Sequence, residues 1–255
     1  MRSTSKSDRG LVRENNEDFL LADEAKGIFL LADGMGGGPA GEVASELAVR
    51  AAHELLAGVP AGQANLDHLR LLAEALAAAH SAVAKKALAE PSLEGMGTTL
   101  DMVLVDGALA FTCHVGDSRI YLFRAGELRQ LTKDDNYAAV LAELEKVPAE
   151  EIATGYRHIL TQVVGISDEL VPEIRRIELK PADLLLMCSD GLTGVLSNAE
   201  IGTVMGSGWR ELSEAADTLV AAANGKGGPD NVSVLIVEPV PAVATGSLPM
   251  LPAAG

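Results

Sequence analysis

Aromatic side chains and positive charge are both scarce in this sequence. Phe, Tyr and Trp make up only 3% of its 255 residues, which leaves few rings for the stacking platforms that bind single-stranded nucleic acids. Lys and Arg number 20 against 36 Asp and Glu, and the formal net charge is -16. This surplus of negative charge repels nucleic acid and anionic membrane surfaces, and it is compatible with a protein that concentrates carboxylates around cations.

Cysteine and long apolar runs are also scarce. Cys113 and Cys188 each lie within an apolar run, and they fit neither a disulfide framework nor the spacing of a zinc site. Residues 1–6 lack the apolar segment of a secretory signal, and no later run approaches membrane-spanning length. We therefore expect two buried thiols, a cytoplasmic location and no contact with a membrane.

The chain is long enough to bury a full core. Apolar residues at helical spacing predict helices over residues 40–56, 66–88, 137–144, 149–152 and 211–223. Short β-rich runs predict strands over residues 98–105, 108–115, 120–123, 128–131, 171–179, 183–188 and 232–237. Asp106-Gly107 between two of these runs favours an antiparallel hairpin. We expect one domain over residues 1–239 and a disordered Pro/Ala-rich tail over residues 240–255.

One stretch organises the rest of the sequence. The apolar run over residues 28–32 leads directly into Asp33-Gly34 and a series of glycines. An Asp on the last residue of a packed strand points its oxygens in a fixed direction, as a metal or phosphate site requires. Asp-Gly is also common turn chemistry. This stretch therefore indicates a metal or phosphate site only if the same pattern recurs elsewhere in the chain.

The pattern does repeat, because further carboxylates stand at strand ends at Asp117, Asp190 and Asp230. Side chains at the ends of packed strands can converge at one edge of the sheets. Oxygen ligands without His or Cys favour hard cations such as Mg²⁺ or Mn²⁺ over zinc, and several carboxylates permit two ions. Since paired ions lower the pKa of a shared water and hold a phosphate for in-line attack, the constellation suggests phosphoester hydrolysis.

Two segments leave alternatives open. The polar segment over residues 7–18 is either a solvated edge or a site in which Arg13 offers a donor fork to phosphate, with Glu17 and Asp18 facing a metal or its waters. Residues 36–41 match the spacing of a dinucleotide-binding turn between a strand and a helix. The long helix and the hairpin that follow count against a nicotinamide or flavin enzyme, because that fold requires a second parallel strand soon afterwards.

Six short motifs, over residues 7–237, resemble in type and order those of the metal-dependent protein phosphatases of type 2C, in their compact bacterial form. The motifs are Arg13 with Asn16-Glu17-Asp18, Ala32-Asp33-Gly34-Met35-Gly36-Gly37, Gly95-Met96-Gly97-Thr98-Thr99, Gly116-Asp117-Ser118-Arg119, Ser189-Asp190-Gly191-Leu192 and Asp230-Asn231. Each motif is weak by itself, but together they are highly specific. The resemblance implies an α+β fold, a four-layer α-β-β-α sandwich of two antiparallel sheets flanked by helices, with the site at the edge of the sheets.

The resemblance also implies a metal centre with two Mg²⁺ or Mn²⁺ ions. Asp33 would bridge both ions, the carbonyl of Gly34 would ligate one of them, and Asp190 and Asp230 would ligate the other. Asp117 would hold a looser third ion together with Asp190.

Further roles are implied for residues around this centre. Arg13 would bind the substrate phosphate, and Glu17 would act mainly through metal-bound water. Asp18 and Asn231 would support the ligands from behind. The residues implied in catalysis itself are Arg13, Asp33, Asp190 and Asp230.

The activity implied is that of a protein serine/threonine phosphatase, in which a metal-activated water attacks phosphorus and no phosphoenzyme forms. Its partners would be phosphorylated proteins and the Ser/Thr kinase that it opposes in bacterial signalling, and we expect a monomer that binds no nucleic acid. The alternative is a catalytically idle metal-binding regulatory module of the same fold.

The sequence departs from the family pattern at two places. Met35 stands where animal members often carry a histidine proposed to protonate the leaving group, and because methionine cannot donate a proton, that role would fall to water. Asp134-Asp135-Asn136 replaces the common Asp-His-Ser. We expect the segment over residues 132–166 to form a flap whose substrate preference does not transfer from the family.

Overall fold

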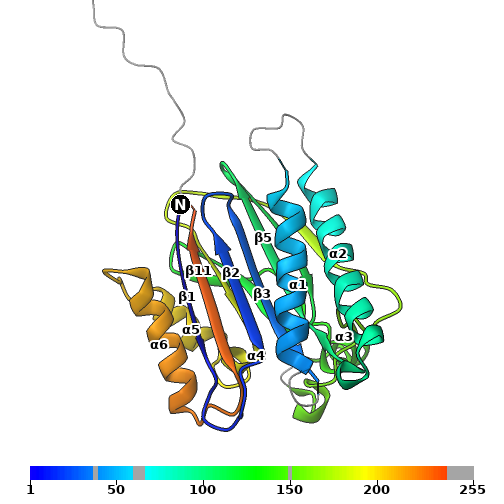
Figure 1. Ribbon diagram of the computed structural model, residues 1–255. Coiled ribbons are helices and arrows are strands. Elements are labelled where there is room, and N and C mark those ends of the chain that lie inside the picture. The colour runs from blue at the N-terminus through cyan, green and yellow to red at the C-terminus, as the bar shows by residue number, and fades with distance from the viewer. Residues whose placement is uncertain (37–39, 60–66, 149–150, 240–255) are drawn as a thin grey trace, which may run out of the picture.

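Two antiparallel sheets packed face to face form the centre of the protein (Figure 1). The computed structural model describes residues 1–36, 40–59, 67–148 and 151–239. The expected tail, residues 37–39 of the glycine-rich turn and the first half of the expected helix over residues 149–152 lie outside these ranges. None of the helices in the described part of the chain is long and apolar enough to cross a membrane.

The first sheet has five strands, and one of its two edge strands was not expected from the sequence. Its order is β1 (Arg2–Asp8), β11 (Val232–Glu238), β10 (Leu184–Cys188), β7 (Arg119–Arg124) and β8 (Glu127–Gln130). Strand β1 is almost entirely polar, and it is held by its backbone ladder with β11 along its full length. An edge strand needs no alternating apolar side chains when its partner is buried, which is why the pattern did not predict it.

The second sheet has six strands. Its order is β2 (Asp18–Asp23), β3 (Ile28–Met35), β5 (Leu100–Asp106), β6 (Leu109–Val115) and β9 (Glu173–Glu178), and the short β4 (Gly97–Thr98) pairs with the end of β3. The expected hairpin forms, but Asp106 pairs with Leu109, so its two-residue turn is Gly107-Ala108, one position later than expected. Strand β3 is antiparallel to both β2 and β5, and this arrangement rules out the dinucleotide-binding unit.

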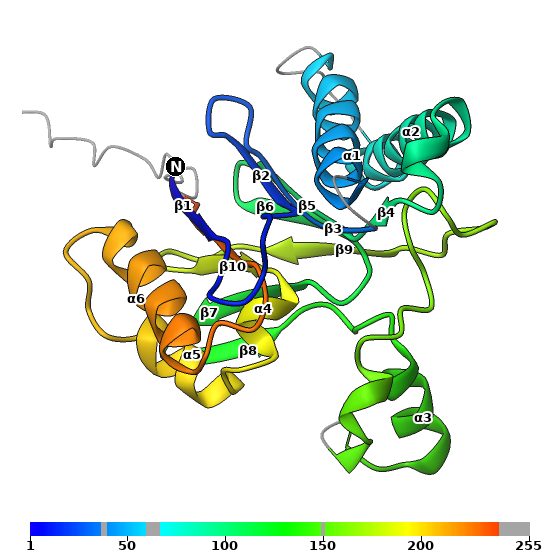
Figure 2. The same ribbon diagram turned by 60° about the horizontal axis from the view of Figure 1, so that its bottom comes forward.

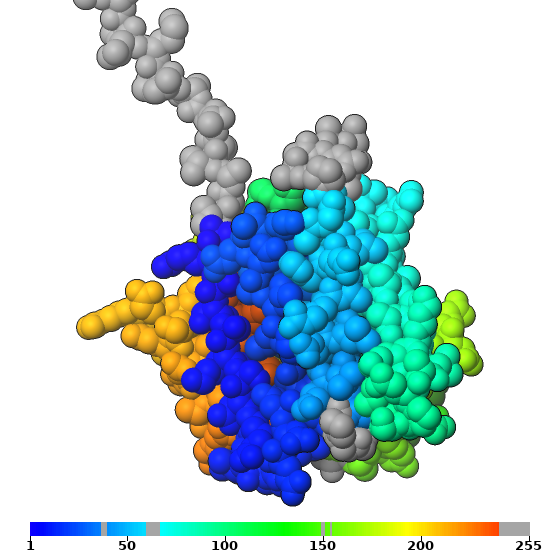
Figure 3. Space-filling view, in the orientation of Figure 1, coloured from blue at the N-terminus to red at the C-terminus, as the bar shows by residue number. Residues whose placement is uncertain are grey.

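Helices cover the outer face of each sheet, so the predicted four-layer α-β-β-α sandwich is confirmed. Helices α1 (Ala40–Ala57) and α2 (His68–Ala89) lie side by side on the six-stranded sheet, where Figure 3 shows them as one continuous surface beside the N-terminal strands. Helices α4 (Asp190–Thr193), α5 (Asn198–Met205) and α6 (Leu212–Gly225) lie on the five-stranded sheet. A third apolar cluster fills the space between the sheets.

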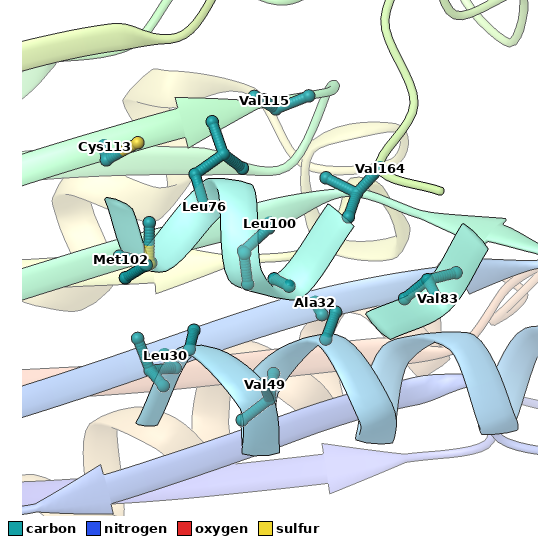
Figure 4. Close-up of a cluster of buried hydrophobic side chains, with 14 of the residues drawn as sticks. Leu30, Ala32, Val49, Leu76, Val83, Leu100, Met102, Cys113, Val115 and Val164 are labelled. Atoms are coloured by element: carbon teal, nitrogen blue, oxygen red, sulfur yellow. The ribbon is translucent and has the colours of Figure 1, made fainter. Parts of the chain in front are cut away.

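The core under α1 and α2 depends on small side chains. Figure 4 shows Val49 of α1 and Leu76 of α2 among buried residues of β3, β5 and β6. The row that α1 buries fully runs through Ala44, Ala48 and Ala52, while longer side chains such as Leu47 are only half-buried. Alanine lets a helix approach a sheet and a second helix closely, so the buried face of α1 is centred on its smallest apolar side chains. Both cysteines are free and buried, as expected.

One helix lies apart from these layers. Helix α3 (Tyr137–Glu145) extends from the edge of the sandwich on connecting segments, as Figure 2 shows, and a 3-10 turn, η3 (Thr154–Tyr156), follows it. Another short 3-10 turn, η1 (Pro91–Leu93), ends the α2 segment. The segment around α3 is the one in which the sequence pattern was weakest.

Candidate active site

Aspartates from both sheets meet at one edge of the sandwich. Burial raises the pKa of Asp33 well above its ordinary range, and the charges of Asp18, Asp190, Asp117 and Asp230 raise it further, in that order. The three strand-end carboxylates that were expected to converge on Asp33 therefore all lie within its electrostatic reach. Asp18 is in direct register with Asp33 on the neighbouring strand β2.

The backbone around Asp33 is fixed by hydroxyl groups as well as by the sheet. Asp33 lies two residues before the end of β3 rather than on its last residue. The hydroxyl of Thr98 donates to the carbonyl of Asp33 at 2.8 Å, and the hydroxyl of Thr99 accepts from its amide at 2.9 Å. The Thr99 hydroxyl also contacts that of Ser118 at 3.0 Å. Thr98, Thr99 and Ser118 belong to the family-like motifs, but their part in holding Asp33 depends on contacts between segments distant in the sequence.

A hydrogen-bonded chain joins the two sheets behind the cluster. The hydroxyl of Ser189 donates to Oδ2 of Asp18 at 2.8 Å and accepts from the amide of Ser233 at 3.0 Å. Oδ1 of Asp18 is buried and has no hydrogen-bond partner among the described residues. Burial outweighs the two serine contacts and raises the pKa of Asp18 to about 7. The position next to Asp33 is thus a buried carboxyl group with unused acceptor capacity.

Asp190 completes the centre of the cluster from the five-stranded sheet. It begins α4 directly after Ser189, and burial and the charge of Asp230 raise its pKa, while the charges of His158 and Arg13 lower it. Asp33 and Asp190 are both half-buried, and like charges gathered in a partly desolvated space favour a shared proton or a cation among them.

The chemistry of this donor set fits hard divalent cations. All its charged donors are carboxylates, which Mg²⁺ and Mn²⁺ prefer, and no imidazole or thiolate replaces them. Among the described residues, no three His, Cys, Asp or Glu side chains form a ready-made ligand cage as they stand. Closing the aspartates on an ion therefore requires their side chains to move from these positions.

Glycines bring the backbone close to the cluster on the α1 side. A Cβ atom on Gly34 would lie 2.0 Å from the carbonyl oxygen of Gly41. A Cβ atom on Gly41 would lie 2.6 Å from the carboxylate of Glu17, and burial raises the pKa of that carboxylate. Only glycine fits at either position, so Glu17 can rest against the first turn of α1 beside the cluster.

Asn231 ties the polar N-terminal segment to the site. Its Oδ1 accepts from the amide of Glu17 at 2.8 Å, and its Nδ2 donates to the carbonyls of Arg9 and Asn15 at 2.9 and 2.7 Å. Of the two alternatives for residues 7–18, the structure therefore favours a segment held at the site over a solvated edge. Asn231 therefore holds the backbone of the loop that carries Arg13 and Glu17.

Arg13 lies at the open side of the cluster. Its guanidinium donates to Oδ2 of Asp230 at 2.7 Å, and its side chain is about half exposed. Asp230 is therefore shared between the acidic cluster and the one arginine that sequence reasoning assigned to phosphate binding.

Asp117 lies in the turn between β6 and β7, and the segment leading to α3 holds this turn. The amide of Gly116 donates to Oδ2 of Asp135 at 3.0 Å, and the carbonyl of Gly116 accepts from the amide of Asp135 at 2.7 Å. Asp135, the middle residue of Asp134-Asp135-Asn136, thus clamps the turn that carries Asp117. Asp117 itself is buried, and burial and Asp190 raise its pKa.

A buried ion pair lies beneath the same turn. Nδ1 of His114 is 2.6 Å from Oδ1 of Asp101, both side chains are at most 1% exposed, and Nε2 of His114 lies 3.1 Å from the carbonyl of Lys133. Burial alone would lower the pKa of His114, but the carboxylate of Asp101 outweighs this effect and raises the value to about 9. No local pattern in the sequence indicates this pair, because the partner of His114 lies on the neighbouring strand β5.

His158 is a further residue at the site that sequence reasoning missed. Nδ1 of His158 lies 3.9 Å from Oδ2 of Asp190, and the side chain is 69% exposed. A cavity of about 1050 Å³ begins at Asp117 and Asp190 and continues between α3 and the N-terminus of α5. The segment that the sequence left least defined therefore forms one wall of the space beside the carboxylates.

Comparison with known proteins agrees with this arrangement. The family model described as protein phosphatase 2C matches residues 4–227. The serine/threonine protein phosphatase PstP of Mycobacterium tuberculosis is 40% identical over 240 residues, which cover 94% of this chain and 45% of PstP, so the chain spans about half the length of that relative. The serine/threonine phosphatase stp of Listeria innocua is 34% identical over 242 residues, which cover 93% of this chain and 96% of stp.

Solved structures show the same likeness. The crystal structure of the Mycobacterium tuberculosis phosphatase PstP/Ppp superposes with a TM-score of 0.84 at 39% identity, covering 92% of this chain and 97% of the other. The catalytic domain of PstP in complex with two manganese ions superposes with a TM-score of 0.81 at 40% identity, covering 92% and 96%.

Proposed function

Because the chain belongs to the protein phosphatase 2C family, we propose that it is a metal-dependent phosphatase acting on phosphoserine and phosphothreonine in proteins. The observation that supports this most directly is the cluster around Asp33, where carboxylates from both sheets lie close enough to raise the pKa of this residue. Such a cluster is unstable alone and is stabilised by cations. The solved relative with two manganese ions makes Mn²⁺ the first ion to test.

In this proposal Asp33, Asp190, Asp230 and the carbonyl of Gly34 hold two Mg²⁺ or Mn²⁺ ions, and Asp117 contributes to a third. Ions bound there supply a water of lowered pKa and offset the charge of the phosphate. In this proposal a metal-bound water is the nucleophile, so no phosphoenzyme would form.

The remaining residues position the substrate and the ligands. Arg13 binds the phosphate from the open side, and its hydrogen bond to Asp230 aims its planar donor fork toward the cluster. Ser189 fixes Asp18 behind Asp33, and Asn231 fixes the loop that carries Arg13 and Glu17. Met35 offers no proton, so water protonates the leaving serine or threonine oxygen.

The test is hydrolysis of phosphoserine, phosphothreonine and phosphotyrosine peptides with Mn²⁺, with Mg²⁺ and with a chelator. We expect turnover of the first two with a divalent ion and none with the chelator. Asp33→Ala should reduce turnover by roughly a thousandfold or more, while circular dichroism shows an intact fold. Near-normal activity in Asp33→Ala would contradict the proposal, and Mn²⁺ binding without hydrolysis of any phosphoester would support the idle module.

A further inference from the structure

The cavity beside the carboxylates is larger than a phosphorylated side chain requires. At about 1050 Å³ it is in the size range of pockets that enclose drug-sized ligands. One end is formed by Asp117 and Asp190, and the other lies between α3 and the first turn of α5. A phosphoresidue at the acidic end would therefore leave most of the space to the residues that flank it in the substrate.

The polar groups that line the far part of this cavity already have partners within the protein. Oδ1 of Asn136 accepts from the amide of Ala139 and caps α3. Oδ1 of Asn198 accepts from the hydroxyl of Tyr121, and Ser197 forms the capping box of α5 with Glu200. A polar substrate side chain would have to compete with these bonds, which makes polar recognition there unfavourable.

Arg157 and His158 also line the cavity, and two further cations on its walls are paired with carboxylates. The guanidinium of Arg119 donates two hydrogen bonds to the carboxylate of Asp134, at 2.8 and 2.7 Å. Lys133 forms an ion pair with Glu143. An acidic substrate side chain next to Arg119 or Lys133 would thus meet a cation that is already neutralised by a carboxylate.

What these pairs leave available is apolar surface on two opposing walls. Ala139, Ala142 and Val147 line the α3 side, and Val195, Leu196 and Ala199 line the α4–α5 side. Small side chains on both walls leave room for a branched or aromatic side chain between them. The surface is continuous with the end that carries Asp117 and Asp190.

We propose that this cavity binds an apolar side chain adjacent to the phosphorylated residue of a phosphopeptide, so that the protein selects substrates by sequence as well as by phosphate. The inference rests on the proposed function, since it uses the acidic end as the phosphate site. In this arrangement the walls of the cavity contact the apolar side chain of the substrate, and the carboxylates at the sheet edge act on its phosphate.

The test compares two phosphothreonine peptides that differ only in the residues flanking the phosphothreonine, leucine in one and glutamate in the other. Burial of a leucine side chain corresponds to a preference of about tenfold or more in kcat/KM for the first peptide. Ala142→Glu places a charge between the walls and should bring the ratio of the two kcat/KM values close to one. Leu144→Glu is the matched control, because this residue lies on the same helix but is 73% exposed and outside the cavity.

A second variant covers the case in which Ala142→Glu does not fold. Ala199→Glu lies on the opposite wall in the first turn of α5, where a negative charge is favourable for the helix, and it should also bring the ratio toward one. Equal hydrolysis of both peptides by the wild-type protein, or an unchanged preference in both cavity variants, would overturn the inference. Hydrolysis of p-nitrophenyl phosphate reports on the phosphate site alone. If the wild-type protein did not hydrolyse this compound, the proposed function would be overturned instead.

Discussion

The two walls of the proposed active site are built in different ways. Asp33 lies in a central strand, its backbone bonded to Thr98 and Thr99, and the carboxylates around it come from segments held by two sheets. Helix α3, on the other side, buries only Ala138 fully and exposes Tyr137 and Leu144. Chemistry requires fixed geometry, whereas recognition of varied substrates tolerates a weakly packed element, and the two walls divide these tasks accordingly.

The wall built from the two sheets also carries an energetic cost that the α3 wall does not. Four aspartates with raised pKa values lie together there, and the sheets hold them in spite of their mutual repulsion. Packing elsewhere in the sandwich offsets this penalty, as is typical of functional sites. The comparison therefore predicts large effects from changes in the sheets and small ones from changes on the outer face of α3.

The largest effect on stability is expected where the two walls are joined. His114→Ala removes the partner of the fully buried Asp101 and the contact with the carbonyl of Lys133, and an uncompensated buried charge costs about 3 to 5 kcal/mol. Chemical denaturation measures this loss. His53→Ala is the matched control, because its contact with Asp23 is partly exposed and such pairs contribute about 0 to 1 kcal/mol. Equal losses of stability in both variants would show that the buried pair contributes no more to the free energy of unfolding than the partly exposed pair does.

The next effect concerns the carboxylates. Asp33→Asn should unfold at higher temperature than the wild-type protein in a chelator, because it removes one of the buried like charges. With Mn²⁺ at a hundred times its dissociation constant, the wild-type protein should gain about 2.7 kcal/mol and the variant far less. Thermal unfolding with and without Mn²⁺ measures both. A variant that is destabilised in the chelator, or that gains as much from Mn²⁺, would contradict the placement of Asp33.

The same charges set the pH dependence of the chelated protein. Where the pKa of a carboxyl group is higher in the folded state than in the unfolded state, the folded protein retains a proton that the unfolded chain has lost. Stability from such a group is fully present below the ordinary pKa of 3.8 and is lost as pH rises through the raised value, about 7 for Asp18. The free energy of unfolding of the chelated protein should therefore fall from about pH 4 to pH 7, and Mn²⁺ should flatten this slope.

A smaller loss is expected at the open side of the site. Arg13→Ala removes a charged hydrogen bond to phosphate, worth about 1.5 to 3 kcal/mol, or roughly 10- to 100-fold in kcat/KM. Arg13→Lys keeps the charge but not the planar fork and should lose less. Steady-state kinetics on one phosphothreonine peptide distinguishes the two, and full activity in Arg13→Ala would remove this residue from the phosphate site.

The smallest effect is expected on the outer face of α3. Leu144→Ala changes a side chain that is 73% exposed, and its free energy of unfolding should stay within about 0.5 kcal/mol of the wild-type value. Leu72→Ala, in the core beneath α2, should lose about 2 to 5 kcal/mol. A large loss in Leu144→Ala would show that this face is covered by a partner.

Local patterns were sufficient where neighbouring residues decide the outcome. The Ser197 capping box opens α5, and the sequence shows it directly because cap and partner are three residues apart. Patterns failed where a distant partner decides: β1 is a strand only because β11 lies beside it, and the pKa of His114 is raised only because Asp101 is on the adjacent strand. The expected helix in residues 132–166 forms as α3, but its apolar side chains Tyr137, Val140 and Leu144 stay exposed, so burial does not fix its place on the sandwich.

The amino-acid sequence by itself determined which positions are proposed to carry the chemistry: aspartates that follow or precede apolar strands, next to glycines or asparagine that set the turn. Those choices are local, so they can be recognised along the chain. Only the tertiary structure decided that these aspartates share one buried space, that Asn231 holds the backbone of Glu17 across 214 positions of sequence, and that α3 leaves a cavity beside them. Strand register and the packing of two sheets create these relations, and both depend on contacts between segments that are distant in the sequence.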